Sequence, residues 1–422
     1  MAALFPINRS LTGPGVVETL ERISAVVPLQ VTEVPSGTEL LDWTVPDEWS
    51  LQGAHIADAD GNHLIDVADH TLHVVSYSEP VAATLTRAEL EVHLHSLPDR
   101  PDLIPYRTSY YSRTWGFCLT QHQREALGDG PFDVLIDSTL APGTFRYGEA
   151  VIPGTDTEDP TEVIVSTHTC HPSMANDNCT GLVAVMAIGG HLLRHPPRRT
   201  HRLLFLPGTL GAIAWLAQHP DARERVHAGL VIGGLGDTDP LTFKASRRGD
   251  TVVDRVAHAV LPRRDASFRP LSFSPYGYDE RQFCSPGFDL AVGRLSRGQH
   301  GEYPEYHTSG DDLAFVDADR VAEGISAALE ILRGIDDNET LDNLSPYGEP
   351  QLGRRGLYSS TGGAIDSRSV EMAYLWVLSG SDGETDLVTI AERADLPIDA
   401  VVEAARRLSD AGLTAPRARG GH

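Results

Sequence analysis

In the middle of the chain, short runs of apolar, often β-branched residues alternate with longer segments in which apolar residues recur every three or four positions. The first pattern is typical of short buried strands and the second of amphipathic helices. The predicted strands are 163–166, 202–206 and 230–233, and the predicted helices are 181–194, 211–219 and 318–334. This alternation favours an α/β fold, with a mostly parallel sheet flanked by helices.

The residues before this region show two other patterns. A helix is predicted at 14–26, where apolar residues fall on one face. Between about 51 and 149, strand-like segments such as 72–77 and 134–137 and a turn at 58–63 indicate hairpins. This part of the chain is therefore predicted to be a β-rich domain inserted into the α/β domain.

The last part of the chain begins with a predicted linker at 336–356, which is rich in Asn, Gly, Pro and Ser. Three helical segments follow, at 371–378, 386–394 and 399–411, and then a short edge, which is the pattern of a winged helix. The predicted domains are an α/β domain at 1–50 and 150–340, an inserted β-rich domain at 51–149 and a winged-helix domain at 350–416.

The composition restricts the partners of the chain. The 422 residues include 34 Lys and Arg against 59 Asp and Glu, a formal net charge of -25, whereas nucleic acids and anionic membranes attract basic surfaces. No nucleic-acid or membrane partner is therefore expected. The chain shows no basic, apolar leader and no apolar run of the roughly 20 residues that span a membrane. Four scattered cysteines favour reduced thiols in a cytoplasmic protein.

A loop rich in metal-ligating residue types follows the strand predicted at 163–166. It contains His168, His171 and Asp177 and ends where the next helix begins, which is the layout of a site at the carboxyl edge of a parallel sheet. Histidine and aspartate bind divalent metals such as zinc. Asp177 also suits a helix N-cap, but we favour the metal ligand.

Two later loops carry related chemistry. His307 lies in a turn-rich loop with Glu305 and Asp311 and fits a ligand oriented by a carboxylate; the alternative is that this loop caps the following helix. Asp279 and Glu280 precede a Pro-Gly turn. They are either a solvated pair or the source of the general base that metal-assisted hydrolysis needs.

Motifs spread over nearly the whole chain resemble those of one family. These motifs are Phe5–Gly13, Asp42–Pro46, Glu48-Trp49, Leu72–Pro80, Ile104–Tyr111, Trp115–Cys118, Cys170–Ser173, Asp279–Gln282 and Tyr303–Ser309. In this order they resemble the zinc aminopeptidase family M28, and more closely its divergent aminopeptidase-like branch, DUF4910 with an inserted DUF2172. The C-terminal segment resembles the winged helix-turn-helix module that such proteins often carry.

The resemblance implies a parallel-sheet hydrolase in which Zn²⁺ polarises an amide carbonyl and activates water. Asp177 matches the family's aspartate ligand and His307 its late histidine ligand. The first histidine ligand in M28 leaves its strand directly, which suits His168, whereas the Cys-His-Pro motif of the closer branch points to His171. We prefer His171 and keep His168 as the alternative, since strand ends are uncertain by a residue or two.

The chain also departs from the family pattern. M28 aminopeptidases carry an adjacent pair of glutamates after a strand, whereas the corresponding residues 204–211 contain no carboxylate. The next family ligand is an aspartate, for which Asp237 is a shifted match. We therefore predict one Zn²⁺ with three protein ligands and an open water position. Glu280 is the preferred base and Glu305 the second choice. His168, Asp237 and Asp311 are either further ligands or residues that orient the ligands.

Side chains that bind the substrate are predicted from motif-like loops. Arg9, Arg107 and Arg247 are candidates for holding a carboxylate, and Tyr110 for lining a pocket; structural pairing is at least as common for such residues. The expected substrate is a small amide or peptide. The inserted domain is expected either to restrict access to the site or to mediate homo-oligomerisation.

Three functions compete at this point. The first is a zinc-dependent hydrolase of an amide, either an aminopeptidase or a deacylase of a small amino-acid conjugate. The second is a descendant that has lost catalysis and kept the fold for binding, which the missing glutamate pair would mark. The third, a DNA-binding regulator, is disfavoured because the predicted recognition helix at 399–411 lacks a basic face.

Overall fold

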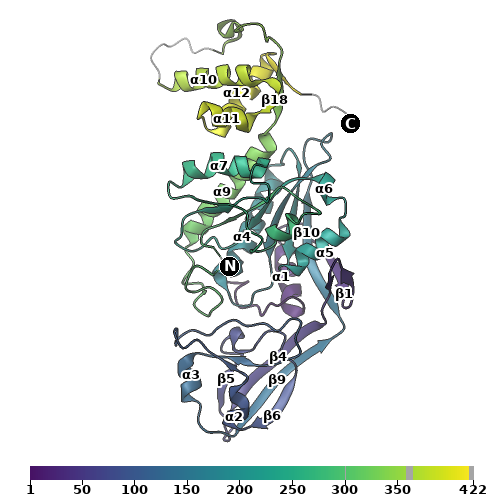
Figure 1. The fold of residues 1–422 in the computed structure, drawn as a ribbon, viewed down its shortest axis with the longest axis vertical. Coiled ribbons are helices and arrows are strands. Elements are labelled where there is room, and N and C mark those ends of the chain that lie inside the picture. Colours follow the sequence, from purple (N-terminus) through teal and green to yellow (C-terminus); the bar gives the residue numbers. More distant parts are fainter. Residues whose placement is uncertain (300, 358–364, 418–422) are drawn as a thin grey trace.

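A computed structural model describes residues 1–299, 301–357 and 365–417. The chain forms three parts stacked along the long axis of the molecule (Figure 1). A sheet inserted near the N-terminus lies at one end, a large α/β domain lies in the middle, and the C-terminal domain lies at the other end. Of the described helices, none combines the length and the apolar character needed to cross a bilayer.

The α/β domain is built on an eight-stranded sheet with the order β1-β10-β12-β11-β13-β16-β14-β15. Its strands are β1 (Gln30–Pro35), β10 (Thr144–Ile152), β11 (Glu162–His168), β12 (Thr200–Leu206), β13 (Val226–Ile232), β14 (Thr242–Lys244), β15 (Arg269–Leu271) and β16 (Val292–Ser296). Strands β12, β11, β13 and β16 run parallel, whereas β10 and β14 pair antiparallel with the ends of this set. The predicted α/β fold with a mostly parallel sheet is confirmed.

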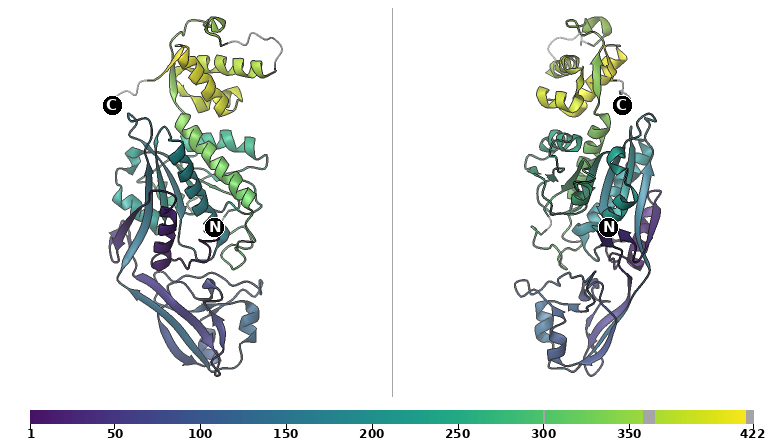
Figure 2. Two further views of the ribbon diagram at one scale, coloured as in Figure 1. Left: turned by 180° about the vertical axis from the view of Figure 1, so that it is seen from behind. Right: turned by 45° about the vertical axis from the view of Figure 1, so that its right-hand side comes forward.

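Helices cover both faces of this sheet (Figure 2). The helices on one face are α1 (Pro14–Ser24), α4 (Thr180–Arg194), α7 (Val252–Arg264) and α9 (Ala318–Asp337), and those on the other are α5 (Leu210–Gln218), α6 (Ala222–Arg225) and α8 (Glu280–Phe283). Strand β11 is buried along its whole length, as expected for a strand covered on both faces. The carboxyl ends of the parallel strands therefore meet at one protected edge.

The inserted part forms its own four-stranded sheet with the order β5-β4-β9-β6. Its elements are β4 (Glu48–Ala57), β5 (His63–Asp66), the 3₁₀ turn Thr71–His73, β6 (Val81–Leu85), α2 (Arg87–Glu91), β7 (Leu94–His95), β8 (Phe117–Cys118), α3 (Gln121–Ala126) and β9 (Phe132–Ala141). A small hairpin, β2 (Glu39–Leu40) and β3 (Trp43–Thr44), precedes it. The strand predicted at 72–77 is wrong, because this segment begins with the 3₁₀ turn and then makes only isolated bridges.

The C-terminal domain combines three helices with a small sheet. Its elements are β17 (Thr340–Asn343), the 3₁₀ turn Leu352–Arg355, α10 (Ile365–Gly380), β18 (Asp382–Asp386), α11 (Leu387–Ala394), α12 (Ile398–Asp410) and β19 (Thr414–Pro416). Strand β17 pairs with both β18 and β19. The segment predicted as a linker, 336–356, therefore holds a strand of the sheet. Arg255 of α7 binds Asp386 at 2.6 Å and joins this domain to the α/β domain.

Candidate metal centre

The loop after β11 carries the candidate ligands at the carboxyl edge of the sheet. His168 is the last residue of β11, and Asp177 lies in the irregular turn Ala175–Cys179 that leads into α4. The side-chain amide of Asn178 donates to Thr167 Oγ1 at 2.7 Å and to the His168 carbonyl at 2.9 Å. Asp311 accepts the backbone N–H of Asp177 at 2.9 Å. The local fold thus holds the carboxylate of Asp177 opposite the end of the strand.

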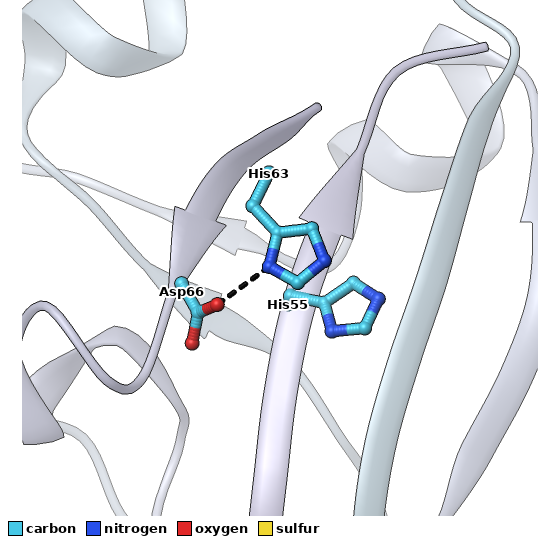
Figure 3. Close-up of side chains that lie close together, drawn as sticks. All are labelled: His55, His63 and Asp66. Atoms are coloured by element: carbon cyan, nitrogen blue, oxygen red, sulfur yellow. Dashed lines mark hydrogen bonds and ion pairs between the residues drawn. The ribbon is translucent and has the colours of Figure 1, made fainter. Parts of the chain in front are cut away.

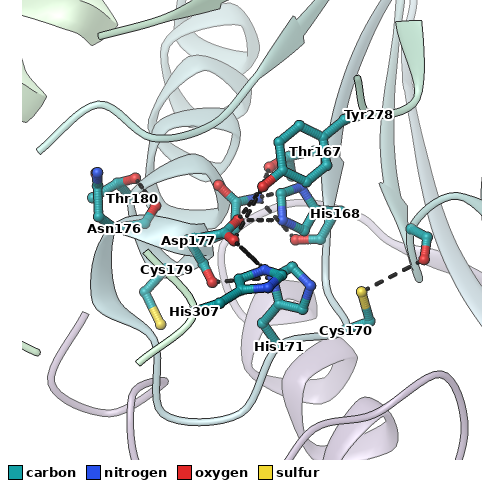
Figure 4. Close-up of polar contacts among 12 residues, drawn as sticks. Thr167, His168, Cys170, His171, Asn176, Asp177, Cys179, Thr180, Tyr278 and His307 are labelled. Carbon is teal, nitrogen blue, oxygen red and sulfur yellow. Dashed lines mark hydrogen bonds and ion pairs between the residues drawn. The ribbon is translucent and has the colours of Figure 1, made fainter. Parts of the chain in front are cut away.

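Three imidazoles converge on the carboxylate of Asp177 (Figure 4). His168 Nε2 lies 2.8 Å from Oδ1, His171 Nδ1 lies 3.3 Å from Oδ2, and His307 Nε2 lies 3.1 Å from Oδ2. The side chains of His168 and Asp177 are almost completely buried, whereas that of His307 is 33% exposed. The cluster is therefore open to solvent on the His307 side.

A second loop brings His307 to this cluster from 130 residues away in sequence. Its backbone is in the left-handed region, with φ of 54°, which is uncommon for a residue with a side chain. The inserted domain holds this backbone in place, because the N–H of Tyr106 donates to the His307 carbonyl at 2.8 Å and Pro105 bridges to Thr308. The ring of Tyr106 also packs edge-on against His171 and His307.

The charge of the cluster follows from its burial and from Asp177. Burial would raise the pKa of Asp177, but the neighbouring His171 and the hydrogen bonds from the imidazoles hold this pKa well below its ordinary value. Burial opposes charge on His171, yet Asp177 outweighs it and raises the pKa of His171. Burial lowers the pKa of His168 to about 4 and also lowers that of His307. The surroundings thus favour the ionised form of Asp177 and of His171, and they favour the neutral form of His168 and His307.

Two tyrosines complete the polar contacts of the centre. The hydroxyl of Tyr278 lies 3.0 Å from both carboxylate oxygens of Asp177 and 3.1 Å from the hydroxyl of Tyr306. The ring of Tyr278 stacks on that of His168. The sequence analysis missed this contact, although Tyr278 directly precedes the acidic pair that it singled out. A phenol at this place can donate a hydrogen bond to an anionic oxygen.

The donor set fits a divalent metal of the zinc type. One donor atom from each of His168, His171 and Asp177 falls within 4.8 Å of the others, and His307 reaches the same carboxylate. Neutral imidazoles and a carboxylate are the usual ligands of catalytic zinc, and hydrogen bonds to such ligands fix their orientation. Both His168 and His171, which the sequence left as alternatives, lie in the cluster.

The two predicted bases lie in different surroundings. Glu280 is completely buried, and its carboxylate is bound by Lys244 Nζ at 2.8 Å and by the N–H of Tyr278 at 3.1 Å. Glu305 contributes its main-chain carbonyl to the turn that holds Thr308. Both carboxylate oxygens of Glu280 are thus already engaged by Lys244 and the backbone of Tyr278, and this geometry does not favour Glu280 as the base.

Asp279, the other member of the acidic pair, lies beside the centre, although the sequence analysis preferred Glu280 as the base. Its side chain is completely buried, and neither of its carboxylate oxygens has a hydrogen-bond partner among the described residues. A methyl group built on Gly208 would lie 3.7 Å from Asp279 Oδ1 and 3.0 Å from the Cβ of His168. Burial, and then the charge of Glu280, raise the pKa of Asp279 to about 7. Buried acids without partners are rare outside functional sites.

Two of the predicted substrate-binding arginines are used elsewhere. Arg9 is buried, and its guanidinium donates to the carbonyl of His171 at 2.9 Å, to Cys179 Sγ and to the carbonyl of Leu4. The prediction for Arg9 is therefore wrong, because all its donors point into the protein beneath the loop. Arg247 pairs with Asp289, so the structure gives it no place at the centre.

The other predicted residues lie around the cluster. Asp311 accepts backbone N–H groups of the Asp177 turn, and Asp237 accepts the side-chain amide of Asn176 at 2.9 Å. Both aspartates thus position the turn. Arg107 lines a hollow of about 660 Å³ beside His307, and Tyr110 lines another of about 270 Å³ beside His168 and His171.

A second group of metal-ligating residue types, His55, His63 and Asp66, lies on the inserted sheet (Figure 3). His63 Nδ1 is 2.6 Å from Asp66 Oδ2. The two imidazole rings stack with centroids 3.9 Å apart and planes only 17° from parallel. Ring nitrogens bind metals in the plane of the ring, so stacked rings cannot both point at one ion as they stand. We interpret this group as a stacked surface pair.

Comparisons with known proteins identify the family of the chain. The family model described as "Domain of unknown function (DUF4910)" matches residues 1–338, and a winged helix-turn-helix model matches residues 339–416. A Clostridium acetobutylicum protein named "Putative polysaccharide biosynthesis protein with aminopeptidase-like domain" is 41% identical over 405 residues, 96% of this chain and 92% of its own length.

Solved structures extend the comparison. A crystal structure of a "putative peptidase" from Clostridium acetobutylicum is 39% identical, with a TM-score of 0.92 over 98% of this chain and 94% of its own. A zinc aminopeptidase from Bacillus subtilis has a TM-score of 0.56 over 78% of this chain and 90% of its own, at 14% identity, which is a likeness of fold. The chain therefore belongs to the DUF4910 family, its residues 1–338 share the fold of the M28 aminopeptidases, and it carries a C-terminal winged-helix domain.

Proposed function

We propose that this protein is a zinc-dependent hydrolase of an amide bond, either an aminopeptidase or a deacylase of a small amino-acid conjugate. The observation that carries the proposal is the convergence of three imidazoles on the carboxylate of Asp177, buried at the carboxyl edge of a parallel sheet. Because neutral imidazoles and a carboxylate are zinc ligands and catalytic zinc keeps one position open for water, we assign His171, Asp177 and His307 as the residues that would hold the ion, with His168 as the alternative first histidine.

The chemistry that a bound zinc ion supplies at such a site is polarisation of a carbonyl and acidification of water. Hydrolysis also needs a group that accepts a proton from the attacking water. We assign this role to Asp279, because no group in the described part of the chain donates to its oxygens and because Glu280 is occupied by Lys244. The hydroxyl of Tyr278 is the proposed donor to the oxygen on which negative charge develops.

A role in DNA binding receives no support from the winged-helix domain. In α12, Arg406 pairs with Glu403 at 2.8 Å and with Asp410 at 3.0 Å, and Arg407 pairs with Glu403 at 2.6 Å. The basic side chains of the predicted recognition helix are thus neutralised on their own helix, whereas a DNA reader presents a basic face. We propose that this domain contacts protein.

The test combines metal content with hydrolysis. The purified chain is analysed for metals and assayed against an aminoacyl anilide, an N-acyl amino acid and N-acetylglucosamine, the last because the name of the relative mentions polysaccharide biosynthesis. We expect bound zinc, hydrolysis of at least one amide class, loss with a chelator and recovery with zinc. A protein that takes up no zinc, or whose zinc-loaded form leaves every amide intact, would contradict the proposal.

A further inference from the structure

Two hollows with different chemistry lie beside the candidate metal centre. His168 and His171 line the smaller one, of about 270 Å³, and His307 lines the larger one, of about 660 Å³. Tyr106 and Tyr110 stand between them, joined by their hydroxyls at 2.9 Å. A substrate whose amide lies at the cluster would therefore place one side of the bond in each hollow.

The larger hollow is rich in arginine. Arg100, Arg107 and Arg124 line it together with a single acid, Asp99, although the whole chain carries a net charge of -25. Arg124 is offset by Glu91 at 2.5 Å and Arg100 donates to a main-chain carbonyl. The contact of Arg107 is a hydrogen bond of 3.2 Å to His95 Nδ1, and its side chain is exposed.

His95, one of the two histidines in this hollow, lies beside these arginines. Burial, followed by the charges of Arg107 and Arg124, lowers the pKa of His95 to about 4. His95 is therefore neutral at physiological pH and presents its nitrogen to Arg107. The guanidinium of Arg107, with its fork of N–H donors, is suited to a carboxylate or phosphate.

The smaller hollow has the opposite character. Among the described residues that line it are Trp43, Tyr110, Tyr111 and Tyr278, and none is an Asp, Glu, Lys or Arg. The rings of Trp43 and Tyr111 lie 5.7 Å apart, and both side chains are partly exposed. Such a lining suits an uncharged, flat group and offers no carboxylate to bind the free ammonium group of an unblocked amino acid.

We propose that the substrate is an amide with an uncharged acyl group in the aromatic hollow and an anionic group in the hollow lined by Arg100, Arg107 and Arg124. This inference rests on the proposed hydrolase function and narrows it from aminopeptidase to deacylase. The inserted domain thereby has a defined task, since it supplies all three arginines and recognises the anionic part of the substrate.

The test uses ligands that share the benzamide part and differ in the charge and type of the terminal group. Binding of N-benzoylglycine, its neutral carboxamide and the corresponding N-benzoylaminomethylphosphonate to the full-length protein is measured by calorimetry. Because charge-assisted hydrogen bonds are strong, we expect at least one anionic ligand to bind about tenfold or more tightly than the carboxamide. The tighter of the two anions identifies a carboxylate or a phosphate as the recognised group.

Arginine variants show which side chains cause the preference for anionic ligands. Arg107→Gln, alone and with Arg100→Gln, is expected to reduce the preference to about threefold or less. Arg113→Gln removes a comparable exposed arginine of the inserted domain, which pairs with Asp47, and is expected to keep the preference. Equal binding of all three ligands to the unchanged protein, or a preference that survives both Arg107 variants, overturns the inference.

Hydrolysis of the same ligands separates this inference from the proposed function. A charge preference in binding, lost in Arg107→Gln, without hydrolysis of any amide contradicts the hydrolase and upholds the anion site. Hydrolysis that is equally fast for the acid and the carboxamide upholds the hydrolase and overturns the anion site. Faster hydrolysis of an unblocked aminoacyl amide than of N-benzoylglycine also overturns it.

Discussion

Among the described residues, two groups of His, His and Asp could hold a metal ion, and only one of these two is arranged as a metal site. At the end of β11, His168, His171 and Asp177 are buried, and the planes of the two rings cross at 76°. On the inserted sheet, His55 and His63 lie at the surface with nearly parallel rings. Residue type and proximity are shared, so the difference between the groups lies in ring orientation and in burial.

The largest expected effect comes from removing the central carboxylate of the buried group. We expect Asp177→Asn to lower zinc affinity by about a thousandfold or more and to abolish hydrolysis, because it removes a ligand and the partner of three imidazoles. Zinc content after dialysis against a metal buffer measures the effect. Asp66→Asn is the matched variant in the exposed group, and loss of zinc from it as well would remove the contrast between the groups.

The second largest effect is expected at Asp279, which lies beside the buried group of ligands. Asp279→Asn is expected to reduce the hydrolysis rate by about 10²–10⁴-fold, which is typical for a general base, while leaving the zinc content unchanged. It is also expected to stabilise the fold. The raised pKa of about 7 means that folding favours the protonated acid, so the native state loses stability as the pH rises above the ordinary pKa of 3.8 and through 7.

Unfolding measurements on Asp279→Asn separate the effect on stability from the effect on the rate of hydrolysis. The variant should gain roughly 2 to 4 kcal/mol over the unchanged protein at pH 8 and less at pH 5, measured by urea unfolding of the metal-free forms. Glu280→Gln is the control with the opposite expected sign, since it leaves the ammonium group of Lys244 buried without its partner. Equal stability of Asp279→Asn and the unchanged protein at both pH values would show that the acid is not strained.

The smallest expected effect is a dependence of zinc uptake on pH. His171 has a raised pKa because of Asp177, so it must lose a proton before it binds a metal. We expect zinc affinity to fall as the pH is lowered, and zinc binding to release protons. Calorimetry in buffers with different ionisation enthalpies measures this release. Binding without proton release would mean that His171 is already neutral.

The fold could be predicted where local pattern and packing agree. The apolar run of β11 and the periodic apolar positions of α4 and α9 were sufficient to place these elements and the parallel sheet. Helix α7 was missed, because valines favour strands and Pro262 interrupts the helical pattern. The capping box formed by Thr251 and Asp254 is the signal that indicates its start.

The site could be predicted only as far as residue types suggest chemistry. The sequence analysis found the candidate ligands His168, His171, Asp177 and His307. Few other roles suit loops that carry histidines and acidic residues in this order. The roles of the other predicted residues depend on contacts with residues that are far away in the sequence. Lys244 neutralises Glu280, and Arg9 bonds to the backbone of His171 from 162 residues away. No pattern near Glu280 or Arg9 indicates which partner the fold will give them.

The pairing of Tyr106 with His307 limits how this chain can be shortened. A protein trimmed to the central α/β domain would keep every candidate ligand and yet lose the neighbour that fixes the last of them in its left-handed backbone conformation. Minimal versions built for screening or crystallisation must therefore retain residues 104–109. Relatives with insertions of other lengths should be compared first at this backbone junction, and only then at the ligands themselves.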